Sequence, residues 1–148
     1  MKRIASIQDI SCLGRCSLTV ALPVISAMGV ECAILPTAVL STHTSFPDFR
    51  CLDLTDQLLP VARHWKAQGV RFDALYTGYL ASDRQVAVVL ELLELLREEG
   101  TLLFVDPAMA DHGKLYAGFG PEFPALMAQV VSKAQITVPN ITEASLMT

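Results

Sequence analysis

The segment Thr101–Pro107 (TLLFVDP) decides the fold, because an Asp-Pro pair directly follows a short apolar run. The run predicts a strand over residues 101–105 that is buried on both faces. A helix pattern precedes it, beginning at Ser82 and ending at Glu99 before Gly100. A second apolar run, residues 73–77, precedes that helix. Strand, helix and strand in this order predict a right-handed βαβ unit with two parallel strands.

The same alternation extends to both ends of the chain. Strands are predicted at 2–8, 31–35 and 134–138, and helices at 18–28, 55–68 and 121–132. Ser17 and Thr142 are expected as helix N-caps, and residues 41–52 as a polar loop. We therefore predict one α/β domain over residues 1–148, with a mostly parallel sheet and helices on both faces in three layers.

Composition excludes several other classes of protein. The chain has 148 residues, of which 52% are apolar and 18% charged, so it is not disordered. No apolar run reaches the roughly 18 residues of a membrane span. A net charge of −4 argues against a nucleic-acid partner.

The N-terminus leads directly into the first predicted strand, without the apolar segment of a signal peptide, so we expect a cytoplasmic protein. The four cysteines form no Cys-x-x-Cys pair, and reduced thiols are expected. The sequence ends at Thr148, about one turn into a predicted helix, and a helix that short is not stable alone. We expect the domain to be incomplete at its C-terminus.

Carboxylates follow the strand at residues 101–105. Asp106 stands at its carboxyl end and Asp111 five residues later. Two carboxylates near a phosphate site suit Mg²⁺, which takes few protein ligands. A simple Asp-Pro turn with a solvated Asp106 is the alternative interpretation.

Two further polar groups lie at strand ends. Asn140 follows the strand at 134–138, and Glu143 lies in the first turn of the next helix, where helix capping alone could account for it. The loop that holds His43 and Thr44 could bind a small aromatic heterocycle, or could be an ordinary surface loop. The chain contains no Walker-type phosphate loop, no Gly-x-Gly-x-x-Gly after the first strand and no Gly-x-Ser-x-Gly elbow.

Six short motifs, taken together and in order, resemble the pyridoxal kinase family of the ribokinase-like superfamily. They are Ser6-Ile7-Gln8 with Gly14, Ala27–Val30, Ser41–Thr44, Thr77-Gly78-Tyr79, Val105-Asp106-Pro107 with Asp111, and Pro139-Asn140 with Glu143. The resemblance covers residues 4–148 and implies the N-terminal half of a ribokinase-like fold.

The resemblance implies substrate-binding roles for four residues. Asp9 matches the residue that bonds the pyridine ring, and Thr44 matches one that contacts the polar edge of the substrate. His43 and Tyr79 match residues of the pocket wall.

The resemblance implies a phosphate and metal site for four more residues. Asp106 and Asp111 match carboxylates near the ATP phosphates, and Asn140 and Glu143 match the phosphate and magnesium-water site. Asp106 and Glu143 are expected to hold Mg²⁺ through water. Whether the site also needs a monovalent cation stays open.

The implied activity is ATP-dependent phosphorylation of the 5′-hydroxymethyl group of pyridoxal, pyridoxine or pyridoxamine by a homodimer. The catalytic base belongs to a Gly-x-Gly-Asp segment expected beyond Thr148, so no catalytic residue is expected in this chain and the chain alone is expected to be inactive. Position 9 is Asp, where many pyridoxal kinases have Ser. An Asp at this position looks more like the hydroxymethylpyrimidine kinases of thiamine synthesis, so that activity is one alternative. A non-catalytic module that binds vitamin B6 is the other.

Overall fold

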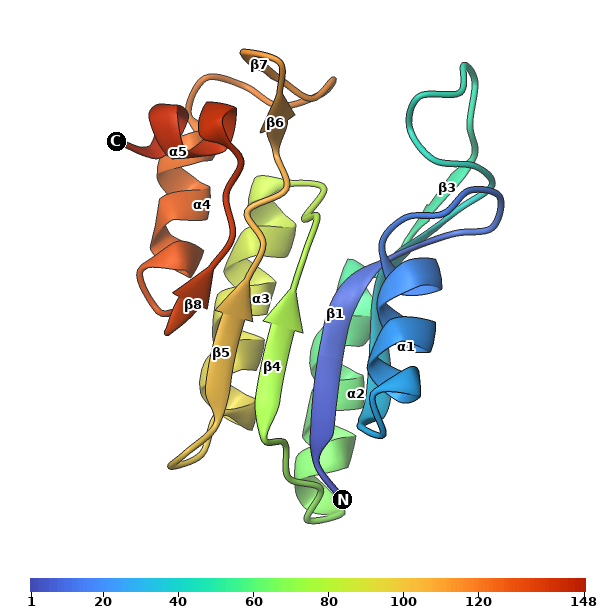
Figure 1. Cartoon of the computed structure of the whole chain (residues 1–148), viewed down its shortest axis with the longest axis vertical. Coiled ribbons are helices and arrows are strands. Elements are labelled where there is room, and N and C mark those ends of the chain that lie inside the picture. Colours follow the sequence, from blue (N-terminus) through green and yellow to red (C-terminus); the bar gives the residue numbers. More distant parts are fainter.

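The computed structural model describes all 148 residues and contains a six-stranded sheet in the order β3-β2-β1-β4-β5-β8 (Figure 1). Its strands are β1 (Arg3–Ser11), β2 (Glu31–Leu40), β3 (Cys51–Asp53), β4 (Ala74–Thr77), β5 (Leu102–Val105) and β8 (Ile136–Thr137). Every neighbouring pair is parallel except β2 with β3. The predicted α/β class and mostly parallel sheet are confirmed.

Helices lie on both faces of the sheet, and the face that carries a single helix is covered only at β1 and β2. They are α1 (Leu18–Ala27), α2 (Thr55–Ala67), α3 (Asp83–Leu96), α4 (Phe123–Val131) and α5 (Ile141–Met147). Figure 1 shows α1 in front of the sheet beside β1 and β2, and α2 and α3 behind it. Apolar residues of α2, α3 and α4 share one buried core with the back of the sheet, including Ile7 and Leu103.

The strand order reverses at β1, and this reversal positions the site. The chain leaves β1 through α1 for β2 on one side, and later reaches β4 on the other side of β1. The connecting helices then lie on opposite faces, and a crevice forms beyond the carboxyl ends of β1 and β4.

Strand β2 is longer than predicted and runs through Pro36 to Leu40. Proline is tolerated there because β3 pairs with β2 only from Ala38 onward, so the missing N–H of Pro36 faces no strand. The segment predicted as a polar loop, residues 41–52, therefore ends in an antiparallel edge strand.

A hairpin that was not predicted from the sequence follows β5. It joins β6 (Ala110–Asp111) to β7 (Lys114–Leu115) through His112 and Gly113. Both turn residues have positive φ, 50° and 77°, as a two-residue type I′ hairpin turn requires. Strands of two residues carry too little sequence pattern to be recognised.

No helix of this structure is long and apolar enough to cross a bilayer. The four cysteines are free thiols, as predicted.

Candidate functional site

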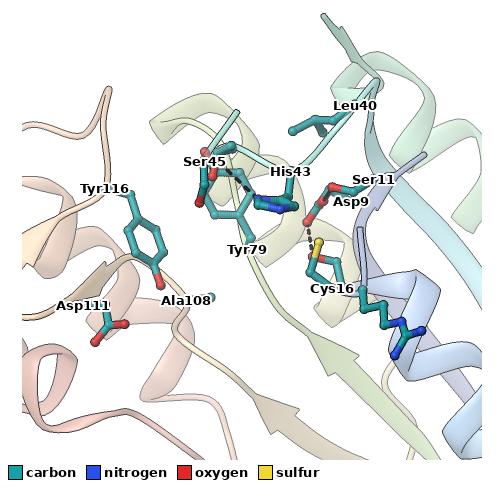
Figure 2. A pocket seen from close by; sticks show the side chains of 13 residues that line it. Asp9, Ser11, Cys16, Leu40, His43, Ser45, Tyr79, Ala108, Asp111 and Tyr116 are labelled. Carbon is teal, nitrogen blue, oxygen red and sulfur yellow. Dashed lines mark hydrogen bonds between the residues drawn. The ribbon is translucent and has the colours of Figure 1, made fainter. Parts of the chain in front are cut away.

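A cavity of about 500 Å³ lies beyond the carboxyl ends of β1 and β4 (Figure 2). It brings together the four predicted substrate residues, Asp9, His43, Thr44 and Tyr79. The remaining lining residues are Ser11, Arg15, Cys16, Ser17, Leu40, Ser45, Ala108, Asp111 and Tyr116. A volume of this size suits a small aromatic ligand, whose pocket typically combines apolar walls with a few polar groups.

Asp9 occupies an irregular position in β1. The pairing with β2 shifts between Gln8 and Ile10, so Asp9 opposes two residues of the neighbouring strand. Its side chain is only 5% exposed, and its Oδ1 accepts a 2.6 Å hydrogen bond from the Ser17 hydroxyl. Bulges of this kind re-aim a side chain near a site. Here the carboxylate is fixed at the cavity wall by a specific donor.

Ser17 precedes α1 at the N-cap position, as predicted, but its side chain does not cap the helix. Its hydroxyl turns to Asp9 instead. The backbone of Ser17 has φ 49° and ψ −131°, a conformation that only glycine adopts without strain. Strain at a residue that holds a cavity carboxylate is a feature of functional sites.

His43 is held against Gly14. A Cβ atom added to Gly14 would lie 2.8 Å from the imidazole Cδ2, and Gly14 has φ 128°, so both space and backbone require glycine there. The backbone N–H of His43 donates to the Leu13 carbonyl at 3.3 Å, and its ring meets Phe46 edge to face at 4.8 Å. The imidazole is thus positioned by the loop that precedes α1.

Aromatic residues form the opposite wall. Burial raises the pKa of the Tyr79 phenol, and the Asp9 carboxylate raises it further. The Tyr79 ring lies 5.6 Å from that of Phe119, which stacks on Phe123 at 3.9 Å. Tyr116, which follows the hairpin, also lines the cavity, and burial likewise raises its pKa. These contacts attach the segment after the hairpin to the wall of the first cavity.

A second cavity, of about 470 Å³, adjoins the first and contains Asp106. It runs between α1 and the sheet and shares Arg15, Cys16, Ser17, Tyr79 and Ala108 with the first cavity. Burial, together with the nearby Glu143 carboxylate, raises the pKa of Asp106 to about 6. The Asp106 side chain makes no hydrogen bond within the protein. It is therefore a half-buried carboxylate without a protein partner, next to the first cavity.

Asn140 and Glu143 line neither cavity and form a capping box at the start of α5. The N-cap is Asn140 and not Thr142, because the Asn140 side chain accepts the Glu143 N–H while the Glu143 side chain accepts the Asn140 N–H. Glu143 is 3% exposed and also accepts the backbone N–H of Met109 at 3.1 Å. The pair fixes the segment that follows Asp106.

The two predicted acidic residues line different cavities. Asp111 lies in β6 and lines the first cavity, whereas Asp106 lines the second. The structure contains no group of three or more side chains that could hold a metal alone. A single unpartnered carboxylate such as Asp106 does fit Mg²⁺, which fills most of its coordination sphere with water and phosphate oxygens.

Several cavity residues were not predicted as site residues, among them Ser11, Arg15, Ser17 and Tyr116. Cys16 also lines both cavities. The His112-Gly113 turn is the one sequence feature that could have placed Tyr116 near the site. A hairpin turn there reverses the chain, so the residues that follow it return toward the end of β5.

The chain is similar to known proteins over nearly its whole length, although no family model matches it. It is 30% identical to the pyridoxal kinase of Arabidopsis thaliana over 152 residues, which cover 99% of this chain and 48% of that protein. The chain therefore spans about half the length of the curated relatives that it matches.

Solved structures give the same result. A candidate phosphomethylpyrimidine kinase from Bacteroides thetaiotaomicron, crystallised with pyridoxal, has a TM-score of 0.94 and 43% identity, covering 99% of this chain and 51% of that one. The pyridoxal kinase of Lactobacillus plantarum has a TM-score of 0.91 and 37% identity, covering 99% and 52%. The Leishmania donovani pyridoxal kinase, crystallised with ADP and ginkgotoxin, has a TM-score of 0.84 and 25% identity, covering 99% and 53%.

The mostly parallel sheet with flanking helices matches that of the pyridoxal kinase structures, which places the chain in the ribokinase-like class of folds. Within that class, the chain corresponds to the N-terminal half of the pyridoxal kinase family, and the resemblance found in the sequence is confirmed.

Proposed function

We propose that the complete protein is an ATP-dependent kinase that phosphorylates the 5′-hydroxymethyl group of pyridoxal, pyridoxine or pyridoxamine. The observation that carries this proposal is the first cavity, which gathers Asp9, His43, Thr44 and Tyr79 from separate parts of the chain. The similarity to pyridoxal kinases, and to a structure that holds pyridoxal, supports vitamin B6 as the substrate class.

The first cavity binds the pyridine ring in this proposal. The Asp9 carboxylate accepts a hydrogen bond from a protonated ring nitrogen or a ring hydroxyl, and the Ser17 hydroxyl holds it in place. His43 and Tyr79 contact the faces of the ring, and Thr44 contacts its polar edge. The hydroxymethyl arm of the ring then extends toward the second cavity.

The second cavity receives the ATP phosphates in this proposal, consistent with the ADP that is bound in the Leishmania kinase structure. Asp106 would hold Mg²⁺ directly or through water, with the Glu143 carboxylate behind it. The ion would supply positive charge to the transferred phosphoryl group. Asp111 and Asn140 would stand at the edge of the phosphate site. With a pKa of about 6, the Asp106 carboxyl is mostly ionised at neutral pH.

Three further expectations from the family resemblance belong to this proposal. The 148 residues alone do not catalyse transfer, because the segment with the catalytic base is not among them. The protein acts in the cytoplasm, and it forms a homodimer.

The alternative substrate is a hydroxymethylpyrimidine. Two observations favour it, namely the carboxylate at position 9 and the 43% identity to the candidate phosphomethylpyrimidine kinase. A non-catalytic module that binds vitamin B6 is the second alternative.

The deciding experiment supplies the complete protein with ATP and Mg²⁺ and measures turnover of pyridoxal, pyridoxine, pyridoxamine and hydroxymethylpyrimidine side by side. The proposal requires phosphorylation of at least one B6 vitamer, with a higher kcat/KM than for the pyrimidine. A higher kcat/KM for the pyrimidine would select the alternative kinase. Binding of pyridoxal without ATP consumption would select the non-catalytic module.

A further inference from the structure

Arg15 is the only lysine or arginine that lines either of the two cavities. It lines both of them, so it lies where the substrate cavity meets the cavity that contains Asp106. The other formal charges in the lining are negative, namely Asp9 and Asp111 in the first cavity and Asp106 in the second. The site therefore has one permanent positive charge, at the boundary between its two parts.

The guanidinium of Arg15 is not used by the fold. None of the ion pairs of the structure includes it, and its side chain makes no hydrogen bond. By contrast, Arg3 and Arg84 pair with Glu31 and Asp56. An arginine presents five donors in a planar fork, which suits bidentate contact with a phosphate group.

The loop that carries Arg15 is held in position at both ends. Gly14 on one side is packed under His43, and the hydroxyl of Thr19 lies within hydrogen-bond distance of the Gly14 and Cys16 carbonyls, at 3.3 and 2.7 Å. The Thr19 hydroxyl also accepts the Cys16 N–H at 3.3 Å. The backbone at Arg15 is therefore anchored although the side chain is exposed, so less conformational entropy is lost when the side chain binds an anion.

We propose that Arg15 binds the phosphate group on the hydroxymethyl arm of the ligand, so that the site distinguishes a phosphorylated vitamer from the free alcohol. This rests on the proposed function, because it assumes that the ring occupies the first cavity. A phosphate monoester placed among Asp9, Asp106 and Asp111 needs a cation to offset the repulsion, and Arg15 is the cation that the two cavities provide.

The test measures the affinity of the full chain for pyridoxine and for pyridoxine 5′-phosphate by calorimetry. Neither ligand has an aldehyde, so neither forms an imine with lysine. Four proteins are compared, the wild type and the variants Arg15→Ala, Arg15→Lys and Arg97→Ala. Arg97 makes no ion pair and lines neither cavity, so it is the matched control.

Arg15→Ala is expected to lower the preference for the phosphorylated ligand by about tenfold, the effect of one charge-assisted hydrogen bond. Arg15→Lys should lower it less, and Arg97→Ala should leave it unchanged. Retained pyridoxine binding shows that each variant is folded. Equal weakening of both ligands, which would place Arg15 against the ring, overturns the proposal, as does an unchanged preference. If the wild type binds neither ligand, both the proposed function and the proposed role of Arg15 fail.

Discussion

Glu143 accepts the backbone N–H of Met109 at 3.1 Å, although the two residues are 34 positions apart. The same buried carboxylate also accepts the N–H groups of Ala110 and Asn140. One side chain in the first turn of α5 therefore accepts hydrogen bonds from backbone N–H groups of two segments. These are the segment that follows Asp106 and the N-terminus of α5 itself. The position of the segment that follows Asp106 depends on this residue.

Replacing Glu143 by Gln should destabilise the fold. The amide nitrogen of Gln cannot accept a hydrogen bond, so at least one buried N–H loses its partner, which costs about 1–3 kcal/mol of the free energy of unfolding. Urea denaturation of the full chain measures the change. Glu99, which is exposed and makes no ion pair, provides the control Glu99→Gln. Equal stability of the two variants would show that the Glu143 contacts contribute nothing.

The raised pKa of Asp106, about 6 in the folded state against an ordinary value of 3.8, predicts a pH-dependent stability. Because the folded value is the higher one, the native state binds the proton more tightly. The stability from the protonated carboxyl is present below pH 3.8 and is lost as the pH rises to about 6.

Asp106→Asn, which is neutral at every pH, should therefore be more stable than the wild type at pH 7.5. The gain should be on the order of 1 kcal/mol once solvent screening is considered. The gain should disappear near pH 3.5 in urea titrations at both pH values. A gain that is the same at both would mean that ionisation of Asp106 is not its cause.

Gly14→Ala should displace His43 and weaken binding of the vitamer. The new methyl group would lie 2.8 Å from the imidazole, on a backbone that alanine adopts with strain. We expect at least about a fivefold loss of pyridoxine affinity, roughly 1 kcal/mol in the relation between affinity and free energy. Gly29→Ala is the control, because Gly29 also has positive φ but no neighbour within 4 Å of the added atom. If both variants lose affinity equally, the contact with His43 is not the reason.

Removing the Ser17 hydroxyl should weaken pyridoxine binding because Asp9 loses its 2.6 Å hydrogen bond and keeps only the 3.4 Å one from the Ser11 hydroxyl. Ser17→Ala and Ser17→Gly should show the same loss, about fivefold to tenfold for one hydrogen bond to a carboxylate. The two variants should differ in stability, since glycine relieves the backbone at φ 49° and alanine does not. Calorimetry and urea denaturation of both variants separate the two effects, and unaltered affinity in both would exclude the positioning role.

The sequence was sufficient for the architecture because its helices and central strands have clear periods and boundaries. The helix predicted from Ser82 is present, and Ser82 accepts the Gln85 N–H as its N-cap. The run at 101–105 became strand β5, but only one of its faces is fully buried, because Leu103 and Val105 are buried while Leu102 is exposed. The residues at strand ends were brought together because parallel strands end at one edge of the sheet.

Features that depend on contacts between distant segments were not predictable. Strand β3 has three exposed residues and no alternation, so only its pairing with β2 makes it a strand. Thr142 was the expected cap, but Asn140 holds that position through the Glu143 carboxylate and also donates to the Ala110 carbonyl. The hydrogen bond from Ser17 to Asp9 depends on a backbone conformation that the sequence gives no reason to expect.

The strained backbone of Ser17 has a consequence for directed evolution of this protein. A library selected for heat resistance alone should accumulate glycine at position 17, because that change relieves the strain. A library selected for retention of the vitamer should keep serine, because its hydroxyl donates the shorter of the two hydrogen bonds to Asp9. The two selections would diverge at a single codon, and the outcome at position 17 would report which property each selection rewarded.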